Sequence, residues 1–146
     1  ERFFGEHDAW QNPVEGALET LAEIEASHAA DILFLTAMPP RHHDRRRALL
    51  DRHGFAHPMI ATENGKGETL AALMRHHPQK PVVFIDDLAP NHVSVLEAVP
   101  DALGLHLMAY RAFAPHLPPM PKGVTSVADW PAAAAAIADF LAGRGR

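Results

Sequence analysis

Two adjacent carboxylates, Asp86 and Asp87, follow the apolar run 82–85. The run shows no alternation of apolar and polar residues, which predicts a strand buried on both faces in a parallel sheet. Ligands of such sheets bind beyond the carboxyl ends of the strands, where these two side chains fall. Neighbouring carboxylates repel each other unless a cation is near, and Mg²⁺ is usually held by one or two carboxylates, water and phosphate. The pair therefore indicates a magnesium site; the alternative is an aspartate-rich turn before a helix N-cap at Asn91.

Two further residues, Thr36 and Lys66, stand where a phosphate could be bound. Thr36 closes the apolar run 32–35, and its hydroxyl, with the free backbone N–H groups of the turn that follows at Ala37, can bind a phosphoryl oxygen. Lys66 lies between two glycines at a predicted helix start, where the backbone can approach a ligand and the ammonium suits a phosphate. Each residue alone also fits a structural role, as a local cap and as an exposed turn lysine.

The elements that must position these residues alternate between helix and strand. Asn12 as N-cap and Pro13 as first residue predict a helix that runs to about His28. Apolar periodicity and breakers predict further helices at about 44–53, ended by Gly54, at 68–76, at 91–99, and from 131 to just before 143. Strands are predicted at 32–36, 59–61, 82–85 and 105–110, and the proline-rich segment 114–123 as a loop. This alternation predicts an α/β fold with a mainly parallel sheet.

Composition limits the class of protein. With 146 residues, 47% of them hydrophobic, the chain is expected to form a single domain over 1–146. A formal net charge of −5 gives no basic field, so neither nucleic acid nor a membrane is an expected partner. The lack of cysteine excludes disulfides and thiol chemistry. Without a long apolar stretch or a signal peptide, a cytoplasmic location is the default expectation.

The chain order of these signals resembles the haloacid dehalogenase (HAD) superfamily. Thr36 at the end of a buried strand, Lys66 at a helix start and Asp86-Asp87 after a second buried strand are similar to its motifs II, III and IV. The resemblance covers about residues 14–110. It implies a Rossmann-like three-layer sandwich without a large cap domain, close to the branch of polynucleotide-kinase-type phosphatase domains and small nucleotidases.

The resemblance also implies roles for these residues. Thr36 and Ala37 would bind the phosphoryl group, Lys66 would neutralise the nucleophile and the transferred group, and Asp86 and Asp87 would hold Mg²⁺ directly or through water. Aligning Asp87 with the metal ligand of the commoner Gly-Asp form favours it as the direct ligand, although the reverse assignment stays open. The expected substrate is a phosphorylated small molecule or another phosphomonoester.

Motif I of that family, a buried strand ending in Asp-x-Asp, is missing from the sequence. Asp8 follows no apolar strand, and Asp31 precedes its strand instead of ending it. The first aspartate of that motif is the nucleophile that forms an aspartyl-phosphate. Three explanations are open: a strand upstream of Glu1, a degenerate member whose sheet closes differently, or a strand from a partner chain. We expect the first, and we expect the given chain alone to be inactive.

Two functions follow as expectations. The intact protein would be a Mg²⁺-dependent phosphomonoester phosphatase; alternatively, the chain would be a catalytically degenerate HAD-like module that binds a phosphorylated ligand or a protein. A receiver domain has the acidic pair first and the lysine last, which is the reverse of the order here. The histidines at 42–43 and 76–77 are predicted to be surface residues, because neighbouring helical side chains diverge and no His-Glu-x-x-His pattern is present.

Overall fold

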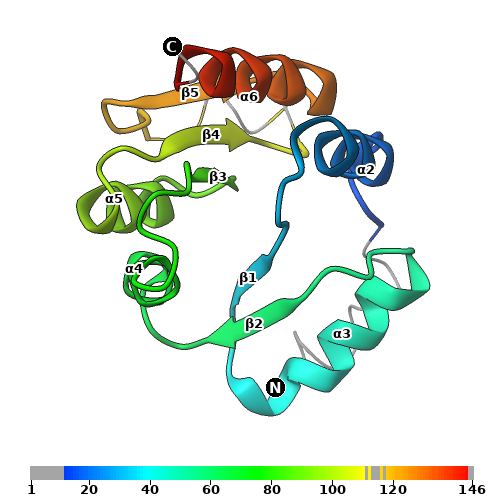
Figure 1. Ribbon diagram of the computed structural model, residues 1–146. Coiled ribbons are helices and arrows are strands. Elements are labelled where there is room, and N and C mark those ends of the chain that lie inside the picture. Colours follow the sequence, from blue (N-terminus) through cyan, green and yellow to red (C-terminus); the bar gives the residue numbers. More distant parts are fainter. Residues whose placement is uncertain (1–11, 111, 113–115, 117, 145–146) are drawn as a thin grey trace. The chain divides into compact units, whose positions relative to one another are not determined.

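A computed structural model describes residues 12–110, 112, 116 and 118–144. The prediction on Asp8 lies outside these residues, as does part of the predicted loop 114–123. The chain divides into two compact units, Glu1–Asn64 and Gly65–Arg146. Each unit is an α/β arrangement, and every strand pairing in the described residues is parallel (Figure 1). This confirms the α/β class and the parallel strands, which lie in two sheets where one was predicted.

The first unit contains a two-stranded parallel sheet. Its elements are α2 (Ala17–His28), β1 (Phe34–Ala37), the 3₁₀ helix η2 (Pro40–His42), α3 (His43–Arg52) and β2 (Met59–Thr62). β1 pairs with β2 in the register Phe34 to Met59. Beside this pair, the rings of Phe34 and Phe55 pack edge to face at 5.6 Å. This contact lies at the start of β1, and Thr36 lies near the carboxyl end of the same strand.

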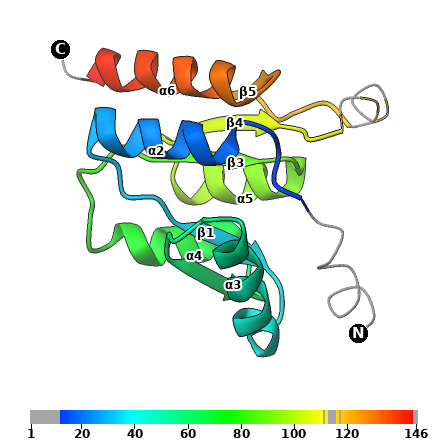
Figure 2. The same cartoon turned by 90° about the vertical axis from the view of Figure 1, so that its right-hand side faces the viewer.

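The second unit has three layers around the parallel sheet β3-β4-β5. Its elements are α4 (Lys66–Met74), β3 (Val83–Asp86), α5 (Ala89–Ala98), β4 (Leu103–Leu107), β5 (Val124–Val127) and α6 (Trp130–Arg144). In Figure 2, α6 lies along one face of the sheet and α5 along the other, and α4 packs against α5. Because strand side chains alternate, Leu105 and Leu107 face the opposite side from Gly104 and His106.

Helix starts were the least accurate predictions. The first helix does not begin at Pro13: a turn from Val14 to Ala17, with Gly16 at φ 78°, precedes it, and Gly16 is the N-cap. The helix predicted from residue 91 begins at Ala89, because Pro90 suits a first helical turn. The one predicted from residue 68 begins at Lys66, with Gly65 as its N-cap.

Other boundaries were closer. The first helix ends at His28 as predicted, and Gly54 after α3 has the expected positive φ, 83°. β1 begins two residues later than predicted and β4 two residues earlier, at 34–37 and 103–107. β5 was not predicted, because its four residues carry too short a pattern after the proline-rich segment. The last helix continues through Gly143 to Arg144 and does not end before the glycine as predicted.

In the described residues, no helix is both long enough and apolar enough to cross a membrane. No large cap domain is present in this part of the chain either.

Candidate functional site

The Asp86 side chain lies at the carboxyl end of β3 and is nine-tenths buried. Its Oδ1 atom accepts hydrogen bonds from the Leu88 backbone N–H at 2.8 Å and from the Asn91 side-chain amide at 2.9 Å. Both donors come from the turn and the first residues of α5, which begins directly after the strand. Asn91 therefore binds the carboxylate and does not cap the helix as predicted.

Lys66 completes the surroundings of this carboxylate. Its Nζ atom lies 2.5 Å from Asp86 Oδ2, and the two side chains are only 12% and 5% exposed. The ammonium also lies 5.7 Å from the centroid of the Phe84 ring, within the range of a cation–π contact. Lys66 is the first residue of α4, so the positive end of that helix faces the same region. The fold thus brings together two of the predicted site residues across twenty positions of sequence.

The remaining predicted site residues have different surroundings. Asp87 is exposed in the bend after β3. Thr36 is half-buried and Ala37 is exposed, and both lie at the end of β1 in the first unit. Within the described ranges, no three side chains among His, Asp and Glu gather closely enough to hold a metal ion by themselves. The assignment of these residues to a site stays a prediction.

His92 is a buried neighbour that sequence reasoning missed. It has no exposed surface, and its Nε2 atom donates to the backbone carbonyl of Asp86 at 3.1 Å. Its ring packs edge to face on Phe84, with centroids 5.2 Å apart. A histidine in the first turns of an otherwise apolar helix carries no local signal of burial, so only its position six residues after Asp86 could have suggested the contact.

A row of polar side chains crosses the sheet at the level of Asp86. Asp86 is paired with His106 on β4, and His106 with Ser126 on β5. Paired residues of neighbouring strands point to the same face, so all three lie on the side covered by α5. His106 is buried, and its Nδ1 atom is 3.1 Å from the Ser126 hydroxyl. This row extends the polar edge of the sheet beyond the residues that sequence reasoning selected.

Protonation of His92 is expected to destabilise the fold. Burial lowers the pKa of His92 below its ordinary 6.5, with His106 and Lys66 acting in the same direction, while Asp86 opposes the shift. The unfolded chain therefore binds a proton at a pH where the folded chain does not. His92 contributes stability above about pH 6.5 that is lost as the pH falls toward the lower, folded-state pKa. Urea unfolding of wild type and His92→Gln across pH 5–8 should show the difference between them shrinking as pH falls.

His43 provides the control with the opposite sign. Hydrogen bonds to the Asp44 carboxylate and the Met59 carbonyl raise the pKa of this histidine. Its contribution is therefore present below about pH 6.5 and is lost as the pH rises through the folded-state pKa. The difference between wild type and His43→Gln should shrink as pH rises. Equal pH dependence in wild type and His92→Gln would contradict the assignment of a neutral, buried His92.

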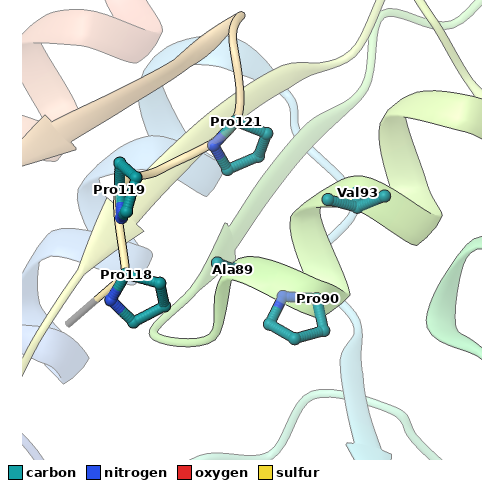
Figure 3. A pocket seen from close by; sticks show the side chains of 6 residues that line it. All are labelled: Ala89, Pro90, Val93, Pro118, Pro119 and Pro121. Carbon is teal, nitrogen blue, oxygen red and sulfur yellow. The ribbon is translucent and has the colours of Figure 1, made fainter.

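An apolar groove lies beside the first turn of α5 (Figure 3). It is shallow and open to solvent, with a volume of about 450 Å³. One wall comes from the start of α5 and the other from the segment before β5; the lining residues are Ala89, Pro90, Val93, Pro118, Pro119 and Pro121. Because α5 follows Asp87 directly, the groove lies at the same carboxyl end of β3 as the acidic pair.

No protein-family profile, curated protein or solved structure matches this chain.

Proposed function

We propose that this chain carries the lysine and acidic half of a HAD-like, Mg²⁺-dependent phosphomonoester phosphatase. In the intact protein, an aspartate upstream of Glu1 would be the nucleophile and would form an aspartyl-phosphate. The observation that carries the proposal is the buried ion pair between Lys66 and Asp86 at the carboxyl end of a parallel strand. A buried ion pair often contributes no more to stability than an apolar pair of similar size, so stability alone does not account for it. Its place at the ligand-binding edge of the sheet supports a functional role.

Of the two acidic residues, Asp87 is better placed than Asp86 to bind Mg²⁺ directly. Asp86 already accepts hydrogen bonds on both oxygens, from Leu88, Asn91 and Lys66. The exposed Asp87 is therefore the better direct ligand, and Asp86 would act through water or by holding Lys66. Mg²⁺ takes one or two carboxylates and fills its other positions with water and phosphate, so the lack of a third protein ligand is compatible with it. When bound, the ion would neutralise charge on the phosphoryl oxygens.

Lys66, Thr36 and Ala37 would then have different roles at the phosphoryl group. The Lys66 ammonium, held against Asp86, presents positive charge at the start of α4, where a phosphoryl group gains negative charge during transfer. Thr36 and the backbone at Ala37 would bind the phosphoryl oxygens. The apolar groove beside α5 offers contact for the leaving group, which favours a phosphomonoester with an apolar part.

The decisive test is activity of the full-length protein on a panel of phosphomonoesters, with and without Mg²⁺. Turnover should require Mg²⁺ and be abolished by EDTA. Asp87→Asn should lower it by at least about 100-fold, because even indirect partners of a metal cost 10–100-fold. Asp139→Asn, an exposed carboxylate on α6, is the matched control and should leave turnover unchanged.

Metal-independent turnover, or an Asp87→Asn variant as active as wild type, would contradict this mechanism. A protein that turns nothing over but still binds inorganic phosphate in a Lys66-dependent way would instead be the degenerate binding module. Phosphate binding followed by NMR at Lys66 separates these outcomes.

A further inference from the structure

His92 makes a contact that packing alone does not require. A neutral imidazole has one N–H, and a carbonyl oxygen can only accept a hydrogen bond. The bond from His92 Nε2 to the Asp86 carbonyl therefore places the ring hydrogen on Nε2. A buried apolar side chain would fill the same space beside Phe84 without burying polar ring atoms. The imidazole supplies one group that an apolar side chain lacks, the N–H that donates to the Asp86 carbonyl.

The sheet beneath this ring leaves space for it. A Cβ atom at Gly104 would lie 3.3 Å from His92 Nδ1 and 3.1 Å from a methyl carbon of Val124. Such contacts are tighter than ordinary van der Waals packing, so any side chain at position 104 would press on the imidazole. Phe84 from the strand and Gly104 from its neighbour thus pack closely around the ring, whose Nε2 meets the carbonyl.

The Asp86 carbonyl belongs to the peptide group that joins Asp86 to Asp87. Because a peptide group is planar, fixing its oxygen also fixes the plane from which the Asp87 backbone continues. The Asp86 carboxylate is held separately, by Lys66, Asn91 and the Leu88 N–H. The side-chain contacts orient the first carboxylate. The peptide group that leads to the second residue is held by the pairing of Asp86 with His106 in the β3–β4 ladder and by the His92 contact.

We propose that His92 is a positioning residue that, together with the β3–β4 pairing, fixes the peptide plane between Asp86 and Asp87, from which the Asp87 side chain would reach the cation. The consequence for Mg²⁺ rests on the proposed function; the effect on the peptide plane does not. Outer partners of a metal ligand set its orientation and so affect affinity. His92 would be such an outer partner, because it contacts the Asp86 carbonyl and would not contact the ion itself.

Two substitutions separate the donor from the packing. His92→Gln can return an amide N–H to the position of Nε2, and His92→Met is similar in size but has no donor. Mg²⁺ alone is titrated into the full-length protein while the Asp87 and Leu88 amide signals are followed by NMR. We expect His92→Gln to bind Mg²⁺ nearly as wild type does and His92→Met to bind it about tenfold or more weakly. The exposed Glu97→Gln on the same helix is the control and should behave as wild type.

Equal Mg²⁺ affinity in wild type and a folded His92→Met would overturn the inference. If Mg²⁺ shifts no Asp87 signal even in wild type, the proposed magnesium site is wrong. The effect of His92 on the peptide plane is then tested with the metal-free spectra. There the Asp87 amide should shift in His92→Met and return in His92→Gln; identical spectra would overturn the inference. The ¹⁵N shifts of the wild-type ring provide a test that needs no variant, since a hydrogen on Nδ1 in place of Nε2 would exclude the proposed donor.

Discussion

Replacing Lys66 with methionine is expected to lower the free energy of unfolding by about 3–5 kcal/mol, because it leaves the Asp86 carboxylate buried without its cation. The side chains of the pair are only 12% and 5% exposed, so solvent screens their interaction little. Asn91 and the Leu88 N–H would still bind Oδ1, but Oδ2 would lose its charged donor. Since folded domains are stable by about 5–15 kcal/mol, the loss should be plain in urea denaturation.

A double-mutant cycle gives the control for this prediction. Asp86→Asn alone should also destabilise the protein, because the Lys66 ammonium is then unpaired. The double variant should lose less than the sum of the two single variants, since neither charge remains. Asp51→Asn, which breaks the surface pair between Arg47 and a 57% exposed Asp51, should cost less than about 1 kcal/mol. A Lys66→Met variant that loses no more than Asp51→Asn would contradict a buried, energetically coupled pair.

Gly67→Ala should destabilise the protein by about 3 kcal/mol or more, at the upper end of overpacking costs. A Cβ atom at position 67 would lie 1.9 Å from the Ser94 carbonyl oxygen and 2.5 Å from its carbon. Both are backbone atoms of α5 and cannot turn aside as a side chain can. The Gly67 N–H also donates to the Ser94 hydroxyl at 3.0 Å, so separating the helices would break that bond as well.

The matched control is Gly143→Ala in α6. Both glycines lie inside helices, where alanine is favoured over glycine by roughly 0.5–1 kcal/mol. At Gly143 nothing lies within 4 Å of the added methyl, so this variant should be slightly more stable than wild type. Thermal unfolding of the two variants side by side separates helix propensity from the clash. Gly67→Ala with wild-type stability would mean that α4 and α5 do not approach each other this closely.

The two variants bear on the candidate site in different ways. Lys66→Met removes a group of the site, whereas Gly67→Ala displaces the start of α4 and so moves Lys66 away from Asp86. Both should abolish phosphatase activity if the proposed function is right. Only Lys66→Met should be partly rescued in stability by Asp86→Asn, because the clash at Gly67 does not depend on charge.

Much of the fold was predictable because its signals are local. The continuous apolar run before Asp86 predicted a parallel strand buried on both faces. β3 is parallel to β4, but half-buried and buried residues alternate along it and it ends the sheet order β3-β4-β5. Gly54 predicted the end of a helix and has the positive φ expected of it. Helix starts were predicted less well: capping residues at Asn12 and Asn91 suggested starts that the chain does not use. Asn91 binds a carboxylate instead, and a side chain can satisfy only one such partner well.

The sequence by itself determined which residues are candidates for a site and at which strand end or helix start they lie. Asp86, Asp87 and Lys66 follow from runs of residues that are neighbours in the chain, and hydrophobic patterning acts over such short ranges. The tertiary structure alone decided that Lys66 pairs with Asp86, that His92 is buried against the Asp86 carbonyl, and that Ser94 requires a glycine at position 67. Burial and hydrogen-bond partners are properties of two segments brought together by packing, and no periodicity within one segment specifies the other.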